Sequence, residues 1–174
     1  MKHILLMRHA KSSWEHSSLK DFDRPLAERG LSDAPLMGRF VNKTGYKPGF
    51  VISSPAQRAK ETTQLFAEAA IIDEQQITWN EDLYFGSVGD YISAIKQVDD
   101  KIERLLLVGH NPLMEQAAGI LAGSEHRTAI RMPTAALVCL ESFTESWQYI
   151  APGTCQLKWM MIPKVLKTVS NNQS

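Results

Sequence analysis

Cysteine is scarce in this chain of 174 residues, which has two, Cys139 and Cys155. They lack CxxC spacing and have no histidine partner nearby in the sequence, which argues against a disulfide framework or a zinc site. Nothing resembles H-E-x-x-H or a Cys-rich cage. We therefore expect no metal and no other cofactor, and a reducing, cytoplasmic location is the simplest expectation.

Excess charge and long apolar runs are also lacking. Nineteen basic residues balance 19 acidic ones, so the net charge gives no reason to expect nucleic acid or an anionic membrane as a partner. The first apolar run, residues 4–7, is too short for a signal peptide core or a membrane span. Any binding of anions must then be local, and the oligomeric state stays open.

Repeats, linkers and low-complexity segments that would divide the chain are absent as well. A chain of this size buries roughly two-thirds of the surface of its unfolded form. We expect a single domain over residues 1–162 and a polar, frayed tail over residues 163–174.

Apolar runs alternate with helical patterns along most of the chain. Residues 3–7, 50–54 and 104–109 read as buried strands, and 76–79 as a shorter one. Helices are expected over a stretch ending at Gly45 with Pro35 near its first turn, after Pro55, over 87–98, and after Pro112 to about Ala122. Residues 135–142 and 155–162 read as a hairpin at a sheet edge. This order predicts an α/β fold, a three-layer α/β/α sandwich with a mostly parallel central sheet.

Chemically active side chains follow three of these strands. Arg8 and His9 end the first, His110 follows the 104–109 strand, and Arg58 lies one turn into the helix after residues 50–54. Ligand sites of such sheets lie beyond the carboxyl ends of the strands. The sequence therefore predicts that these four side chains meet at one edge.

The four side chains suit the binding and transfer of a phosphoryl group. The planar forks of Arg8 and Arg58 match phosphate oxygens, and the helix starts after Ser54 and Gly109 would add N–H donors. A neutral His9 can attack phosphorus and form a phosphohistidine, while His110, cationic or donating, stabilises charge on the phosphoryl oxygens. We also place Ser12 provisionally at the mouth of the pocket, as a substrate contact.

Four motifs occur in an order that resembles a known family: "LMRHAKSSW", "DFDRPLAERG", "ISSPAQRAKET" and "LLVGHNP". They are similar to those of the histidine phosphatase superfamily, with the phosphoglycerate mutase-like fold, and within it the short SixA-like branch associated with protein phosphohistidine. The resemblance spans roughly residues 3–122. It implies that His9 is the nucleophile, that Arg8 and Arg58 bind phosphate, and that His110 is the second histidine of the pocket.

The proton donor is the assignment that stays open. Larger family members place a Glu after the third strand, and "WNEDLYFG" offers Glu81 and Asp82, of which Glu81 aligns better. An alkoxide leaving group needs such an acid, whereas a phosphoimidazole can be protonated beforehand on its other nitrogen. The family also has Gly where Ala10 stands here. "DFDRPL" is expected to fix a loop over the site through Asp23 or Arg24.

Three functions remain on these grounds. The first is a metal-independent phosphatase that acts through phosphorylated His9 on protein phosphohistidine, for which a short chain without a large lid insertion leaves an open site. The second is a small-molecule phosphomonoesterase of the same fold. The third is a phosphate-binding module without turnover, which would have no use for a nucleophile.

Overall fold

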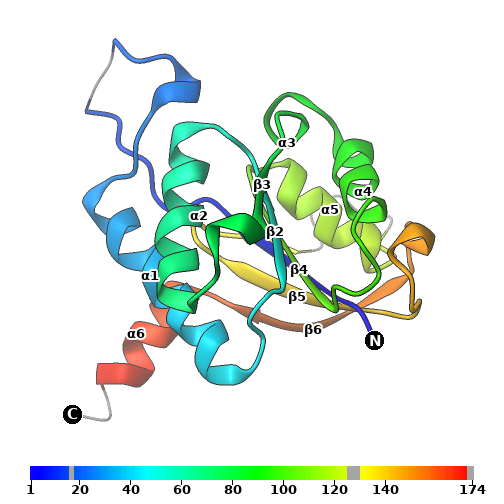
Figure 1. Ribbon diagram of the computed structural model, residues 1–174. Helices are drawn as coiled ribbons and strands as arrows, with labels where there is room; N and C mark the ends of the chain where they lie inside the picture. The colour runs from blue at the N-terminus through cyan, green and yellow to red at the C-terminus, as the bar shows by residue number, and fades with distance from the viewer. Residues whose placement is uncertain (16–17, 125–129, 172–174) are drawn as a thin grey trace.

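The computed structural model describes residues 1–15, 18–124 and 130–171, which form one six-stranded sheet between helices (Figure 1). The strand order is β3-β2-β4-β1-β5-β6. The strands are β1 His3–Arg8, β2 Phe50–Ser53, β3 Ile77–Trp79, β4 Arg104–Gly109, β5 Leu137–Ser142 and β6 Cys155–Met161. The helices are α1 Glu28–Thr44, α2 Gln57–Ala70, α3 Asp82–Phe85, α4 Val88–Lys96, α5 Leu113–Leu121 and α6 Pro163–Asn171, with 3-10 turns at Asp21–Asp23, Glu74–Gln76 and Trp147–Tyr149.

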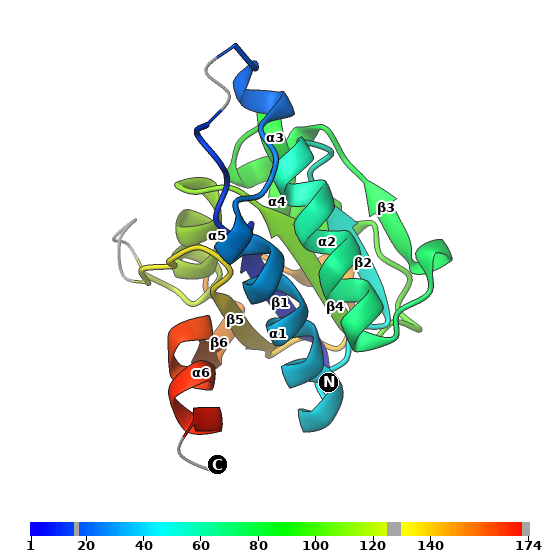
Figure 2. The ribbon, with the colours of Figure 1, turned by 90° about the vertical axis from the view of Figure 1, so that its left-hand side faces the viewer.

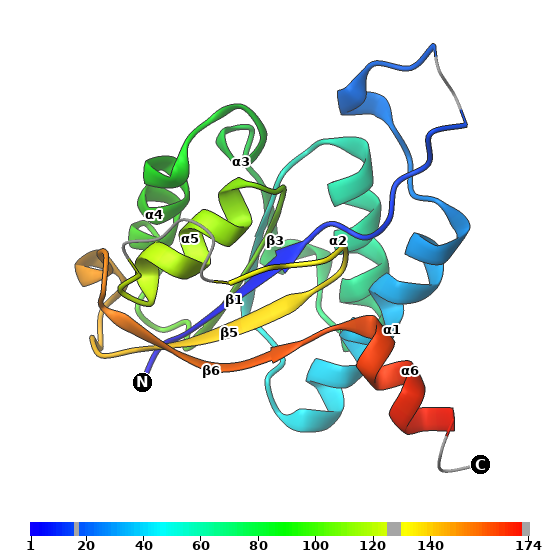
Figure 3. The same ribbon diagram turned by 180° about the vertical axis from the view of Figure 1, so that it is seen from behind.

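Helices cover both faces of the sheet, which confirms the three-layer sandwich. Side chains of α1 and α2, with Leu166 of α6, pack on one face, while those of α3, α4 and α5 pack on the other. Figure 2 shows α1 and α2 side by side, and Figure 3 shows β5 and β6 from behind. Between β3 and β4 the chain forms only the short helices α3 and α4 as its α-helices, so this segment holds no large lid.

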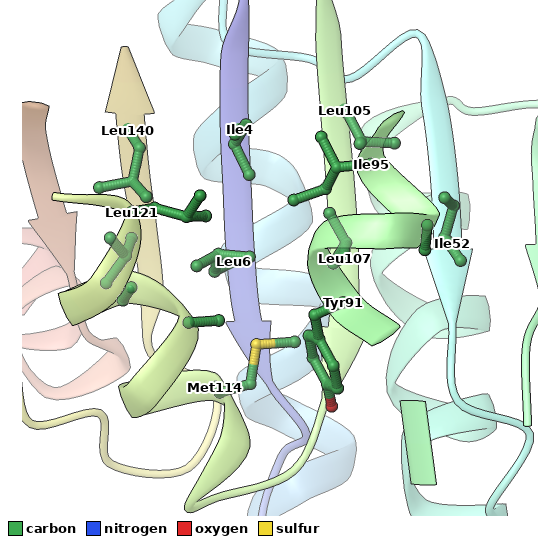
Figure 4. Close-up of a cluster of buried hydrophobic side chains, with 14 of the residues drawn as sticks. Ile4, Leu6, Ile52, Tyr91, Ile95, Leu105, Leu107, Met114, Leu121 and Leu140 are labelled. Atoms are coloured by element: carbon green, nitrogen blue, oxygen red, sulfur yellow. The ribbon is translucent and has the colours of Figure 1, made fainter. Parts of the chain in front are cut away.

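Strand β1 divides its side chains between the two faces because its residues alternate. Ile4 and Leu6 point to the α4–α5 side (Figure 4), whereas Leu5 and Met7 point to the α1–α2 side. All four are completely buried. Since full burial of such a side chain contributes about 1.5–3 kcal/mol, this strand is a firm base for the residues that follow it.

The register of the sheet brings three strand ends to the same edge. β1 runs parallel to β4 with Arg8 opposite Gly109, and β2 runs parallel to β4 with Ser53 opposite Val108. β5 pairs antiparallel with β1, and β6 pairs antiparallel with β5, which confirms the expected hairpin. Residues that follow β1, β2 and β4 therefore emerge together.

Helix α1 differs from the sequence prediction at its proline. Pro35 lies inside α1 and not near its first turn, because the helix already begins at Glu28. The bond that proline cannot make would go to the carbonyl of Leu31, a residue that is half-exposed rather than on the buried stripe. The end was correct, since Gly45 caps the helix with a φ of 77° and donates to the carbonyl of Val41.

The expected frayed tail is wrong for most of its length, because Pro163–Asn171 form helix α6. Lys167 pairs with Asp33 of α1, and Leu166 packs against the α1–α2 side of the core, so this helix is docked rather than free. Residues 172–174 of that range lie outside the described residues. Among residues 1–15, 18–124 and 130–171, every helix falls short of the length and apolarity that a bilayer crossing requires.

Candidate active site

His9 and His110 face each other at the carboxyl edge of the sheet. His9 follows β1 directly, His110 follows β4, and the backbone N–H of His9 donates to the carbonyl of Gly109 at 2.9 Å. The ring centroids are 5.1 Å apart. The sheet register thus places the two imidazoles together, as the sequence predicts.

The hydrogen bonds of His9 define its tautomer. Nδ1 lies 2.7 Å from the carbonyl oxygen of Ala10, which can only accept, so Nδ1 carries the proton. Nε2 then carries a lone pair, which accepts a hydrogen bond from Arg58 Nε at 3.3 Å. Burial is the main cause that lowers the pKa of His9 to about 3; the Ala10 bond raises the pKa, and the nearby charges of Arg58 and Arg8 lower it. His9 is therefore neutral near pH 7, with Nε2 free to attack an electrophile.

His110 is held by Ser54, which the sequence placed before a helix start without giving its side chain a role. Ser54 Oγ lies 2.8 Å from His110 Nε2 and accepts from the N–H of Ala56. If the hydroxyl proton goes to Nε2, Nδ1 carries the ring proton, and Nδ1 is buried without a partner. Burial, followed by the charge of His9, lowers the pKa of His110 to about 3. This favours a neutral His110 that donates over the cationic form that the sequence also allowed.

The two arginines approach the histidines in different ways. Arg58 is 7% exposed and reaches back from the first turn of α2 to His9. Arg8 donates from Nη1 to the carbonyl of Met132 at 3.0 Å, while its buried Nε has no partner among the described residues. Both cations are close enough to lower the pKa of His9 and of His110. Among the described residues, Arg8 Nε and His110 Nδ1 are thus buried N–H groups without a partner, and each could donate to an oxyanion.

A carboxylate that sequence reasoning missed lies over the site. Asp21 accepts from Arg58 Nη1 through its backbone oxygen at 2.6 Å and from Arg58 Nη2 through Oδ2 at 2.9 Å. Tyr84 of α3 also donates to Asp21 Oδ2, at 2.8 Å, and its ring meets His110 edge-on at 5.2 Å between centroids. Desolvation raises the pKa of Asp21, but the bonds from Tyr84 and Arg58 outweigh it and the pKa is lowered. Asp21 is therefore ionised near neutral pH.

The loop that carries Asp21 is fixed as expected through Arg24, although not through Asp23. Arg24 pairs with Asp21 at 3.1 Å, donates to Ser12 Oγ, and stacks on the ring of Trp14 at 3.5 Å. The signal for Asp21 was present in "DFDRPL", but the motif has two aspartates and spacing alone could not choose between them. Figure 2 shows this segment at the same end of the molecule as α3.

Two provisional site residues are not joined to the histidines. The Glu81 side chain is exposed at the start of α3 and makes no hydrogen bond or ion pair within the described part of the chain. Ser12 is buried, and its hydroxyl accepts from Arg24. The structure therefore brings together Arg8, His9, Arg58 and His110. It also adds Ser54, Asp21 and Tyr84 to the same place. Within residues 1–15, 18–124 and 130–171, groups of three or more His, Cys, Asp or Glu side chains arranged to hold a metal are absent.

Comparisons with known proteins agree with this geometry. Residues 4–86 match the histidine phosphatase superfamily (branch 1). An uncharacterized protein of Mycobacterium tuberculosis is 32% identical over 165 residues, which cover 91% of this chain and 100% of that protein. A structure from Agrobacterium tumefaciens, named for the phosphohistidine phosphatase SixA, is 28% identical with a TM-score of 0.77, and covers 93% of this chain and 98% of that one.

The chain belongs to the histidine phosphatase superfamily. A further SixA-named structure, from Nakamurella multipartitia, shares the fold with a TM-score of 0.78 at 24% identity, covering 93% of this chain and 96% of that one. The fold is phosphoglycerate mutase-like, and within the superfamily the chain resembles the short SixA-like branch. Membership supports phosphatase activity for this chain.

Proposed function

We propose that this histidine phosphatase hydrolyses phosphohistidine on proteins through a phosphoryl group carried by His9. The observation that carries the proposal is the state of His9: Nδ1–H is bound to the Ala10 carbonyl, and the Nε2 lone pair is held beside Arg58. A neutral, oriented imidazole between two arginines is suited to attack a phosphoryl group. A binding module without turnover would not need that state.

Bond changes at His9 follow from its tautomer. Nε2 forms a bond to phosphorus, the P–N bond of the substrate breaks, and the substrate imidazole leaves neutral, having been protonated on its other nitrogen beforehand. Phosphorylated His9 keeps Nδ1–H against the Ala10 carbonyl, which stabilises its positive ring. Water then attacks phosphorus, and phosphate departs as Nε2 regains its lone pair. Arg8 Nε and His110 Nδ1 are the donors for the phosphoryl oxygens.

The carboxylates near the site favour a P–N substrate over an ester. Asp21 is held ionised by Tyr84 and Arg58, so it is a poor source of a proton for an alkoxide. Glu81 is exposed and makes no bond that would fix it near a leaving group. A phosphohistidine does not depend on such an acid. Solved structures of similar fold also carry the name of a phosphohistidine phosphatase, at 28% identity in one case.

We include in the proposal that the reaction needs no metal and takes place in the cytoplasm. Arg8 and Arg58 supply the positive charge that a metal would otherwise bring, and the neutral His110 adds an N–H donor. Small phosphate esters remain the second candidate, because a short chain with an open site does not by itself exclude them.

The test is to offer purified protein a phosphohistidine protein and a panel of phosphate esters, with chelator present. The wild type should release phosphate from phosphohistidine faster than from esters, and His9→Ala should lose at least about 10³-fold in kcat. A phosphoryl group that is labile to acid and stable to base should be trapped on the wild type alone. Equal hydrolysis by His9→Ala would rule out the nucleophile, and faster ester cleavage would favour the second candidate.

A further inference from the structure

A second basic hollow lies beside the phosphoryl site and shares Arg8 with it. Its volume is about 580 Å³. It lies where the end of β1 meets the starts of α1 and α5 and the segment before β5, and Figure 2 shows that segment between α5 and α1. The charged and amide side chains that line it are Arg8, Lys11, Arg29, Arg131, Asn111 and Glu115.

Positive charge in this hollow exceeds negative charge, although the whole chain is neutral. Glu115 Oε1 is already bound by Asn111 Nδ2 at 2.9 Å and by the N–H of Met132 at 2.7 Å, so it serves to hold the segment before β5. Arg29 pairs with Asp33 at 3.7 Å, but Asp33 also pairs with Lys167. Glu115 and Asp33 therefore do not neutralise the positive charge of the basic side chains in the hollow.

Lys11 and Arg131 are the two free charges of the hollow. Both are exposed, and neither side chain has a hydrogen bond or an ion pair within the described part of the chain. They come from segments far apart in the sequence, one after β1 and the other before β5. Cations gathered in a concave site raise the local concentration of anions and accept their oxygen atoms.

We propose that this hollow binds the carboxylate of an acidic side chain that lies next to the phosphorylated histidine of a protein substrate. The inference rests on the proposed function and adds a preference for acidic sequence around the phosphorylated residue. Arg8 belongs to both sites, so a substrate can place its phosphoryl group at His9 and a carboxylate near Lys11 and Arg131 at the same time. An exposed basic residue of this kind contributes about threefold to fivefold to affinity, and two of them about tenfold.

The experiment compares two peptides that carry a stable phosphohistidine analogue flanked either by Glu or by Gln. Binding is measured by fluorescence anisotropy, which does not depend on turnover. The wild type should bind the Glu peptide about tenfold more tightly, with a preference that weakens as salt increases. Lys11→Gln with Arg131→Gln should remove most of that preference. The matched control is Arg39→Gln with Lys43→Gln, the same loss of charge on the exposed side of α1, and it should keep the preference.

Equal binding of both peptides by the wild type, or loss of the preference in the control alone, would contradict the proposal that the hollow is a carboxylate subsite. A second arm compares phosphoglycolate with ethyl phosphate as competitors. Discrimination there without discrimination between the peptides would assign the carboxylate to a small molecule and overturn the protein source. The proposed function is tested separately with Glu- and Gln-flanked peptides that carry phosphohistidine itself. It fails when neither of these is hydrolysed, whereas hydrolysis of both with equal KM leaves the function and removes the subsite.

Discussion

The base of the site comes from strand ends, whereas its rim comes from loops that meet through side chains. At the base, His9 and His110 follow adjacent parallel strands and are joined by a backbone bond between His9 and Gly109. At the rim, Asp21 and Tyr84 are separated by 63 residues and are joined by one side-chain hydrogen bond. The base is therefore as rigid as the sheet, while the rim depends on contacts that single substitutions can remove.

The base and the rim of the site also differ in their chemical groups. Base groups are neutral imidazoles and unpaired donors in a buried place, which suits the binding of a phosphoryl group. The rim supplies Asp21, whose carboxylate accepts from Arg58 Nη2 and whose backbone carbonyl accepts from Arg58 Nη1. Phosphate and the Asp21 carboxylate thus compete for Arg58 Nη2, so substitutions at the base should lower turnover and substitutions at the rim should change affinity.

Among changes that keep the nucleophile His9, the largest effect is expected for His110→Ala at the base. Loss of the Nδ1 donor should reduce kcat about 10²- to 10³-fold, as for other donors that stabilise charge in a transition state. Steady-state hydrolysis of a phosphohistidine protein measures it. The matched control is His3→Ala, a histidine at the opposite end of β1 that pairs with Glu141 and should leave kcat unchanged. A loss of less than about threefold for His110→Ala would show that the base does not depend on this donor.

The two buried histidines should also make the fold sensitive to acid. Each has a pKa lowered to about 3 when folded and near 6.5 when unfolded. Below pH 6.5 the unfolded chain therefore takes up protons that the folded chain does not, and stability falls as pH falls toward 3. Each histidine contributes a loss of about 1 kcal/mol per pH unit.

Urea unfolding at pH 6 and pH 5 measures this loss. The double variant His9→Asn with His110→Asn should lose about 2 kcal/mol less than the wild type over that unit. Parallel losses in the two proteins would mean that the imidazoles are protonated in the folded state.

A third change tests how tightly the base is packed. A Cβ at Gly109 would lie 2.2 Å from the Tyr91 hydroxyl and 3.0 Å from Met114 Cε. Gly109→Ala should therefore lower the free energy of unfolding by about 2 kcal/mol, and Tyr91→Phe in the same chain should recover part of it. Gly89→Ala in α4 is the control, because its Cβ would meet Ser87 Oγ at an ordinary 3.4 Å. Urea midpoints that agree for the two alanine variants would contradict the close packing.

The contrast between the base and the rim also explains which parts of the site could be predicted from the sequence. Apolar runs locate β1, β2 and β4, and a parallel register then places His9, His110 and the start of α2 at one edge without further information. The placement of Arg58 followed from its position one turn into a helix. Tautomers, the bond from Ser54 and the lowered pKa values depend on atoms that no motif specifies.

The contacts of the rim could not be predicted from the sequence, because the residues that form them are far apart in the sequence and of common types. Two aspartates in "DFDRPL" were equivalent until the turn at Asp21–Asp23 oriented one of them toward Arg58. Helix α3 has four residues, too few for a periodic pattern, so Tyr84 gave no signal beyond its aromatic ring. The helix α6 was missed because its polar composition resembles a tail and its docking depends on Lys167 meeting Asp33.

The smallest effect is expected at the rim, for Asp21→Asn. The Asp21 side chain is 54% exposed, so its charge is partly screened, and its removal should change affinity rather than abolish turnover. Without the carboxylate, Arg58 Nη2 is free for an oxyanion and a repulsive charge is gone. Tungstate, a phosphate mimic, should then inhibit about threefold to tenfold more strongly. Asp23→Asn, in the same turn but without a bond to Arg58, should leave inhibition unchanged. Weaker inhibition in Asp21→Asn would mean that the carboxylate positions Arg58 for phosphate rather than competing with it, and would join the rim to the base.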